Sequence, residues 1–338
     1  MTRTLIVGGK FINQGYKGLV MDVYNKNMKD KKTLYSELKY GEPEEITLIT
    51  IDDGRNIKIK GKETINEILE SLKSVEHTLV KKFIYANFLF GSKEHNFNNE
   101  LMGYKKLIKI FKKDINKHTT IKSGFEYKNR DIYGLIFNGD YYLFLEECFQ
   151  TLDNIKFTQQ ELNKCSKEIK ETLDILREND YIHNDLKPNN MILCKNRYKI
   201  IDWESSGEIK KQPKTIINTK NGNFAYNYPL KLYNLGVPFL LYRIIYNVEL
   251  GVYEYKNKKL NKLNKLKLPK RIQREIFNSF SKVLENYKKI KKTDKYYYTR
   301  LYDYYSFALT IIYLAEINKL TYDKKVIHPI LEKFCIYL

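Results

Sequence analysis

Short apolar runs separated by turn residues recur along the chain, a pattern typical of antiparallel hairpins. From Thr158 to Asn179 the apolar residues recur every three or four positions, which predicts an amphipathic helix. A second, more apolar helix is predicted from Phe307 to Ala315. The predicted hairpins join residues 46–51 to 56–60 through Asp-Gly, residues 132–137 to 141–145 through Asn-Gly, and residues 191–194 to 198–201 through Lys-Asn-Arg.

Polar side chains flank the last of these hairpins. Asp185 and Asn190 precede it, and Asp202 follows it directly. A hairpin can bring all three to one edge, where two carboxylates and an amide would meet. Because Mg²⁺ prefers a few hard oxygen ligands and keeps waters or phosphates in the rest of its shell, this edge is a candidate magnesium site.

These residues also carry a family resemblance. The stretches His183–Asn190 and Asp202–Glu204 resemble the H-R-D-L-x-x-x-x-N and D-F-G motifs of protein kinases. The resemblance implies one domain over residues 1–338, with a two-lobed α+β fold. Its β-rich N-lobe would span residues 1–145, and its mainly helical, shortened C-lobe would span residues 146–338.

The same resemblance assigns chemical roles. Asp185 would act as the base that accepts the proton of a substrate hydroxyl, and Lys187 would contact the γ-phosphate of ATP. Asn190 and Asp202 would hold Mg²⁺. Lys187, two residues after the base, resembles serine/threonine kinases and favours protein hydroxyls as acceptors.

A glycine-containing hairpin is predicted over residues 4–23, ahead of these motifs. In kinases a G-x-G-x-x-G-x-V hairpin covers the ATP phosphates, because glycine lets backbone amides approach the oxygens closely. Gly15, Gly18 and Val20 match the last three fixed positions, whereas Asn13 replaces the first glycine.

Two lysines compete for the role of the phosphate anchor in the predicted strand 78–84. Lys81 and Lys82 are adjacent, so they face opposite sides of a strand and one of them points to the nucleotide. The apolar pair after Lys82 favours that residue by the resemblance, and Lys81 stays open as the alternative. Glu100, in a predicted helix over residues 97–107, would fix the flexible lysine stem.

The segment Glu146–Phe149 resembles the hinge of kinases, where backbone groups bind the adenine edge. The residues assigned to this contact are Glu146 and Cys148, with Leu145 limiting the depth of the pocket.

Two insertions interrupt the pattern. Residues 24–77 predict a small inserted subdomain, with a helix that begins at a Thr64–Glu67 capping box and ends near Lys73. Residues 231–300 precede Asp303-Tyr-Tyr-Ser306, which resembles the kinase Asp-x-Trp-Ser motif. There the Asp opens a buried helix and accepts backbone hydrogen bonds from the catalytic loop. One further helix is expected after residue 316.

Three departures bear on regulation. Asn184 replaces the Arg that pairs with a phosphorylated activation loop in many kinases, so we expect activity without such phosphorylation. Glu204 replaces a Gly whose backbone freedom assists switching of the metal-binding loop. Gly222–Leu230 resembles the segment that shapes the substrate loop, with Leu230 in place of its Glu.

The composition of the chain bears on its binding partners and on its location in the cell. The chain has 338 residues, 43% of them hydrophobic, and a formal net charge of +20, which favours acidic partners. AT-rich codon usage would also explain the lysines and is the favoured interpretation. The basic tract 256–274 could contact nucleic acid, although a solvated segment is the favoured interpretation. The first residues lack the apolar run of a signal peptide, and helix 307–315 is too short to span a bilayer.

The sequence therefore predicts a Mg²⁺- and ATP-dependent serine/threonine protein kinase. We expect a cytoplasmic location. If the composition and the long insertions reflect an origin in a large DNA virus, the location would be the host cytoplasm or the virion. Two alternatives stay open. His-Asn-Asp and Asp-aromatic-Glu also resemble choline and aminoglycoside kinases, and Asn13, Glu204 and Leu230 would suit a pseudokinase scaffold.

Overall fold

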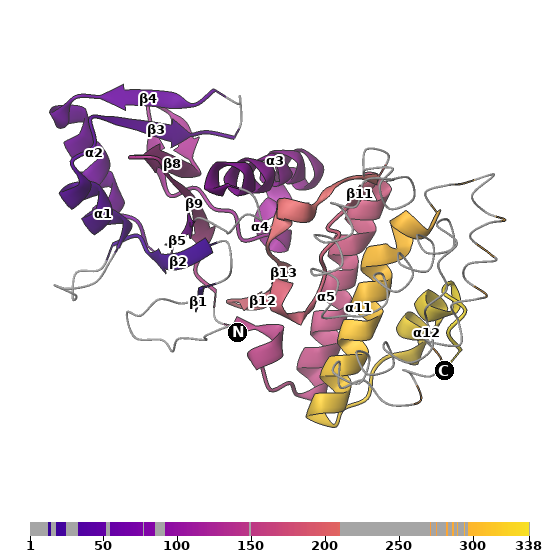
Figure 1. The fold of residues 1–338 in the computed structure, drawn as a ribbon. Coiled ribbons are helices and arrows are strands. Elements are labelled where there is room, and N and C mark those ends of the chain that lie inside the picture. Colours follow the sequence, from indigo (N-terminus) through magenta and orange to yellow (C-terminus); the bar gives the residue numbers. More distant parts are fainter. Residues whose placement is uncertain are drawn as a thin grey trace. The chain divides into compact units, whose positions relative to one another are not determined.

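The computed structural model describes residues 13–14, 18–24, 33–51, 55–76, 78–84, 92–148, 150–209 and 297–337, together with the single positions 271, 275, 282, 286, 289 and 294. The chain divides into two compact units, Met1–Phe149 and Gln150–Leu338 (Figure 1). The first is rich in strands and the second is mainly helical, which confirms the predicted α+β fold. The predicted lobe boundary after residue 145 lies near this division.

The first unit contains a seven-stranded antiparallel sheet in the order β1-β2-β5-β9-β8-β3-β4. A separate hairpin joins β6 (Phe125–Tyr127) to β7 (Arg130–Ile132). Asn138 and Gly139 both have positive φ angles in the β8–β9 turn, which explains the Asn-Gly pair there. The strands are β1 (Asn13–Gln14), β2 (Gly18–Asp22), β3 (Glu45–Ile49), β4 (Ile57–Lys60), β5 (Thr78–Phe83), β8 (Gly134–Phe137) and β9 (Asp140–Glu146).

Helices cover both faces of this sheet (Figure 1). Helix α3 (Lys93–Phe111) lies on one face, where Phe97 contacts Phe83 with ring centroids 5.4 Å apart. Helices α1 (Leu34–Gly41) and α2 (Lys62–Lys73) contribute to the core on the other face. The turn η1 (Lys112–Asp114) and helix α4 (Ile115–His118) follow α3.

Residues 24–77, predicted as an inserted subdomain of the N-lobe, contribute to the main sheet and core of the first unit where the structure describes them. Strand β3 pairs with β8, and the β3–β4 hairpin therefore extends the main sheet. One apolar cluster contains buried side chains from this segment and from the central strands, among them Leu38, Ile46, Ile68, Val80 and Phe144. The segment completes the core because its apolar face has no other partner within the described residues.

The start of α2 also differs from the prediction. The helix begins at Lys62, with Gly61 as its N-cap at a φ of 95°, and no side chain caps it. The Thr64–Glu67 spacing thus falls inside the first turns, and the capping-box prediction is wrong.

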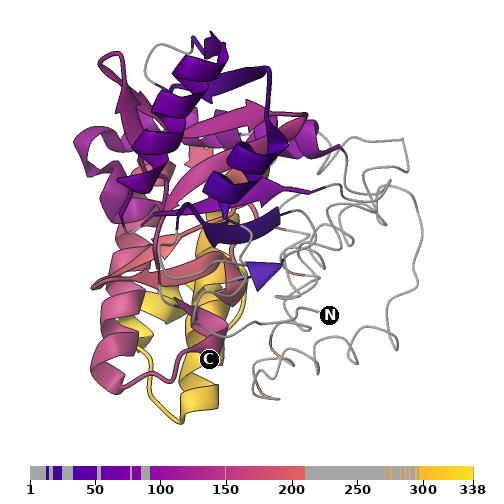
Figure 2. The same cartoon turned by 90° about the vertical axis from the view of Figure 1, so that its left-hand side faces the viewer.

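The second unit is built around two helices, α5 (Gln159–Glu178) and α11 (Tyr297–Asn318), which lie side by side (Figure 1, Figure 2). Helix α12 (Lys324–Glu332) packs beside α11 and is the expected further helix. Short strands form β10-β12-β13 and β11-β14 sheets. Their bounds, with the 3-10 turns, are β10 (Gln150–Thr151), η2 (Leu152–Asn154), β11 (Tyr181–Ile182), η3 (Pro188–Asn190), β12 (Met191–Cys194), β13 (Arg197–Ile200), η4 (Trp203–Ser205) and β14 (Gly207–Glu208).

Helix α5 forms where its periodicity predicts. Thr158 and Glu161 cap each other's backbone N–H groups at its start, so two groups that lack helical partners are satisfied. The apolar positions Leu162, Cys165, Ile169, Leu173 and Leu176 are all buried.

Helix α11 begins earlier than predicted. It starts at Tyr297, so Asp303 lies inside the helix rather than at its first residue. None of the described helices, α11 included, combines the length and the apolar character needed to cross a bilayer.

Candidate active site

The loop between β11 and β12 gathers three of the predicted site residues. Asp185 is buried, and its Oδ2 accepts hydrogen bonds from Lys187 Nζ at 2.9 Å and from Asn190 Nδ2 at 3.1 Å. Asn190 Nδ2 also donates to the Asp185 carbonyl oxygen at 2.8 Å. One carboxylate oxygen is thus held by an ammonium and an amide, so its position and direction are fixed.

The β12–β13 hairpin brings Asn190 close to the chain that leads into Asp202. Met191 pairs with Ile200 at the open end of the hairpin, and Ile201 N donates to the Asn190 carbonyl oxygen at 2.9 Å. Asp202 follows with a left-handed backbone, at a φ of 66°. Such a conformation is uncommon for a residue other than glycine and clusters at functional sites.

The donor chemistry of this edge suits Mg²⁺. Because Asn190 Nδ2 donates to Asp185, the amide oxygen is the atom that remains for a cation. Asp202 carries a carboxylate on the residue after Ile201, whose N–H donates to the Asn190 carbonyl oxygen. Hard oxygen donors in small number are the set that Mg²⁺ takes.

His183 supports the loop from below. It is fully buried, its Nε2 lies 2.9 Å from the Ile201 carbonyl oxygen, and its Nδ1 accepts from Asp185 N at 3.3 Å. One nitrogen thus donates and the other accepts, which is the pattern of a neutral imidazole. Burial lowers the pKa of His183 and favours the same neutral form. The neutral ring therefore anchors the backbone at Asp185 and Ile201.

Asp303 of α11 holds the same loop from the other side. Its Oδ2 accepts from His183 N at 2.6 Å, and its Oδ1 accepts from Asn184 N at 2.9 Å. Burial raises the pKa of Asp303, while the hydrogen bonds from the backbone N–H groups of His183 and Asn184 oppose that rise. The predicted backbone hydrogen bonds from the loop to this carboxylate are confirmed.

Asn184 has a φ of 70°, a left-handed conformation that Asn tolerates better than most residues. This provides a local reason for Asn at a position where the related motif carries Arg.

Trp203 anchors the segment after Asp202, a role that sequence reasoning missed. Its side chain is fully buried, its Nε1 donates to the Ile200 carbonyl oxygen at 3.0 Å, and its ring meets the His183 ring edge-on. Ser206 Oγ donates to the Trp203 carbonyl oxygen at 2.6 Å. An indole N–H is the signal that could have suggested this anchor, because a buried Trp needs a hydrogen-bond acceptor.

The first unit holds a separate set of predicted residues, and here the lysine preference is corrected. Lys81 Nζ lies 2.5 Å from Glu100 Oε2, and both side chains are largely buried. Strand pairing places Lys81 directly opposite Val20 of β2, so the two share one face of the sheet. The predicted partner of Glu100 was Lys82, and that pairing is wrong.

Lys82 points to the opposite face. Its Nζ lies 2.8 Å from Glu37 Oε2 and 2.8 Å from Asp140 Oδ2. The sequence left both lysines open because alternation in a strand does not say which face is which.

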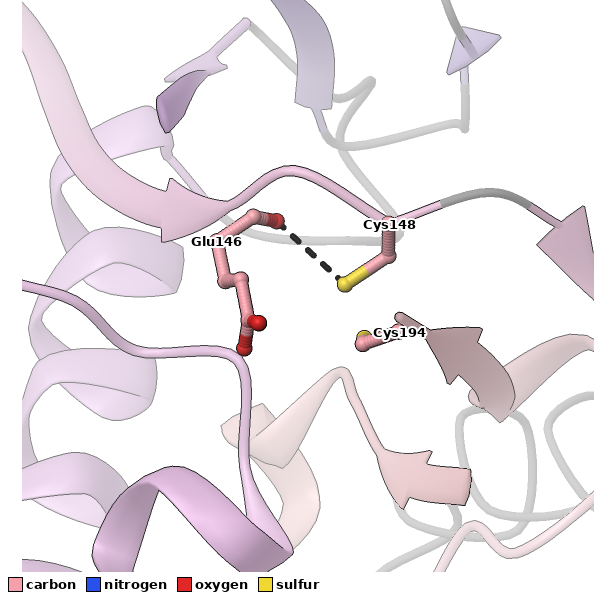
Figure 3. Close-up of side chains that lie close together, drawn as sticks. All are labelled: Glu146, Cys148 and Cys194. Carbon is pink, nitrogen blue, oxygen red and sulfur yellow. Dashed lines mark hydrogen bonds between the residues drawn. The ribbon is translucent and has the colours of Figure 1, made fainter. Parts of the chain in front are cut away.

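The other nucleotide-side positions are described in part. Gly18 begins β2, whereas Gly15 lies outside the described residues. In the predicted hinge segment, Glu146 N donates to the Thr120 carbonyl oxygen at 2.7 Å, and Cys148 Sγ lies 3.4 Å from the Glu146 carbonyl oxygen (Figure 3). Cys194, also drawn there, ends β12 in the second unit.

Several predictions fall outside the described residues. They concern the strand at residues 4–7, the segment Gly222–Leu230, the basic tract 256–274 apart from position 271, and most of the insertion 231–300.

Residues 126–232 match the family model described as protein kinase domain. This range contains Asp185, Lys187, Asn190 and Asp202, as well as the hinge segment. A comparison with curated proteins found no match for the chain.

Proposed function

The chain belongs to the protein kinase superfamily, and on this premise we propose that it transfers the γ-phosphoryl group of Mg-ATP to serine and threonine hydroxyls of proteins. The class of phosphotransferase follows from the family. The cofactors, the acceptor and the roles of individual residues are the proposal.

The catalytic loop carries this proposal. Asp185 Oδ2, which Lys187 and Asn190 fix in place, accepts the proton of the acceptor hydroxyl. The oxygen of that hydroxyl forms a bond to the γ-phosphorus as the bond between the γ-phosphorus and ADP breaks. Lys187 also contacts the γ-phosphate, and its ammonium group offsets the negative charge of that phosphate. Asn190 and Asp202 would hold Mg²⁺, which would supply positive charge to offset that of the phosphates.

The nucleotide side is assigned to Lys81 in place of Lys82. Glu100 fixes the Lys81 ammonium, as a phosphate-binding lysine on a flexible stem requires. The face shared by Lys81 and Val20 supports this choice. Gly15, Gly18 and the backbone of Glu146 and Cys148 remain proposed contacts of the phosphates and the adenine.

The acceptor class rests on two observations. Lys187 stands where serine/threonine kinases carry a lysine, and the matching family model is that of protein kinases. The net charge of +20 favours acidic proteins among the acceptors. All the charged catalytic positions are present, which supports transfer rather than a scaffold role.

The test is phosphotransfer from labelled ATP by the purified full chain, with general protein acceptors, choline and an aminoglycoside offered in parallel. Label should enter serine and threonine of the proteins, and Asp185→Ala and Asp202→Ala should each lower the rate at least about a hundredfold. Glu178→Gln, which removes an exposed carboxylate at the end of α5, is the matched control and should keep the wild-type rate.

Each other outcome has a meaning. Label in the small alcohols alone would support a small-molecule kinase. Absence of both nucleotide binding and transfer would support a pseudokinase, and undiminished turnover of Asp185→Ala would reject the assigned base.

A further inference from the structure

Four charged side chains of the first unit, none of them part of the Lys81–Glu100 pair, form a network of ion pairs. Lys82 of β5 contacts Glu37 of α1 at 2.8 Å and Asp140 of β9 at 2.8 Å. The other oxygen of Asp140 contacts Lys93, the first residue of α3, at 2.7 Å. The contacts therefore run from α1, through the sheet, to the start of α3.

The path connects the two faces of the sheet. Lys82 lies on the face that α1 and α2 cover, whereas α3 covers the face of Lys81. Asp140 begins β9 directly after the β8–β9 turn, and one carboxylate serves a lysine from each side. The ion pairs thus connect α1 to the start of α3.

The Lys82–Glu37 pair is more buried than an ordinary surface ion pair. The Lys82 and Glu37 side chains are each 18% exposed, and Tyr142 Oη donates to the same Glu37 oxygen at 2.5 Å. Burial alone would lower the pKa of Lys82, but the bonds to Asp140 and Glu37 outweigh it and raise the pKa. Partly desolvated charges interact more strongly because solvent screens them less.

The position of Lys93 gives an independent reason why Asp140 should stabilise the start of α3. A lysine in the first turn of a helix is unfavourable, because the N-terminal end carries partial positive charge. The Asp140 carboxylate beside Lys93 offsets this and ties the helix start to β9. Glu100 lies two turns further along the same helix and contacts Lys81.

We propose that Glu37 and Asp140 are positioning residues, which hold the start of α3 and thereby keep Glu100 against Lys81. Helix α1 of the inserted segment then helps to position Lys81, the proposed nucleotide-binding lysine. The significance of the Lys81–Glu100 pair rests on the proposed function, while the mechanical link from α1 to α3 does not.

The experiment uses the full chain and two readouts. Hydrogen–deuterium exchange without nucleotide reports on the first turns of α3, and binding of Mg-ATP reports on the Lys81 site. Glu37→Gln and Asp140→Asn should each speed exchange at the start of α3 by about threefold to tenfold and weaken Mg-ATP binding by a similar factor. Glu70→Gln is the control, because it breaks an exposed ion pair to Lys73 on the neighbouring helix α2.

A double variant tests the path itself. Glu37 and Lys93 belong to the network through Lys82 and Asp140, so the effects of Glu37→Gln and Lys93→Gln on exchange should be less than additive. Lys93→Gln also covers the case in which Asp140→Asn fails to fold, because it alters only a partly exposed helix start.

Unchanged exchange at the start of α3 in Glu37→Gln and Lys93→Gln, or strictly additive effects, would overturn the proposal. Faster exchange in a chain that binds no Mg-ATP would uphold the link and reject the proposed function instead. Rescue of exchange and affinity by Glu37→Asp in place of Glu37→Gln is expected, because a carboxylate is restored.

Discussion

Lys81 and Lys82 are neighbours in β5, yet their ammonium groups serve opposite faces of the sheet. Lys81→Met should lower phosphotransfer at least about a hundredfold, because it removes the cation that Glu100 positions for the phosphates. Lys82→Met should lower it far less, by about tenfold or below, because Lys82 acts through the helix start. The ratio kcat/KM for ATP distinguishes the two, and equal losses would contradict the assignment.

His183 makes stability depend on pH near neutrality. Its folded-state pKa lies below the ordinary value of 6.5, because burial disfavours the charged ring. Below pH 6.5 the unfolded chain takes up a proton that the folded chain does not, so the unfolding free energy falls as pH falls toward the folded-state pKa. The slope from this group is at most about 1.4 kcal/mol per pH unit.

His183→Gln should reduce that slope, because its amide can donate to Ile201 without titrating. Urea unfolding of both proteins between pH 7.5 and 5 measures the difference. Parallel pH profiles would count against His183 as the source.

Asn184 bears on regulation. With Asn in place of Arg, this position has no cation to pair with a phosphorylated loop, so phosphatase treatment should leave the transfer rate within about twofold. The assay compares treated and untreated enzyme on one acceptor, with Asp202→Ala as the inactive reference. A strong loss of activity after treatment would contradict the prediction.

For single residues, the sequence predicts which side chains belong to the candidate site better than it predicts which side chains they contact. Asp185, Asn190 and Asp202 lie within one short stretch, so a single hairpin determines their arrangement. The choice between Lys81 and Lys82 depends on Glu37, which is 45 positions from Lys82 in the chain. A periodicity of two cannot reveal so distant a partner.

Among the elements, the helices and strands of segment 24–77 share the apolar core of the first unit. Ile68 of α2 is fully buried in that core. Ile68→Ala should therefore cost about 2 to 5 kcal/mol of unfolding free energy, from lost burial and a residual cavity. Glu67→Ala, at the exposed neighbouring position, should change it by less than about 0.5 kcal/mol.

Thermal or urea unfolding of the full chain measures both variants. If Ile68→Ala matched Glu67→Ala, α2 would pack more loosely than the core cluster indicates.

Hairpins and the long helix α5 were predictable because their signals are local. Asn-Gly determines the β8–β9 turn, and Thr158 with Glu161 caps α5. The start of α2 was not predictable in this way, since Gly61 caps it without a side chain and Thr64 gave a competing signal. The place of β3 beside β8 depends on pairing between residues far apart in the chain.

For the whole molecule, ligand binding should couple to stability. Mg-ATP at about 100 times its Kd should add about 2.7 kcal/mol to the unfolding free energy, because it binds the folded chain alone. Removing Mg²⁺ with a chelator should abolish most of this gain, and Asp202→Ala should show little difference with and without the metal. Differential scanning fluorimetry provides the measurement, and a metal-independent gain would argue against Asp202 as a ligand.

The hydrogen bonds from His183 and Asn184 to Asp303 span 120 and 119 positions of the chain. During synthesis on the ribosome, the catalytic loop therefore emerges long before the carboxylate that holds it. A nascent chain that stops short of α11 lacks the carboxylate that accepts the backbone N–H groups of His183 and Asn184. The loop that holds Asp185 therefore depends on contacts that form only after α11 has been synthesised.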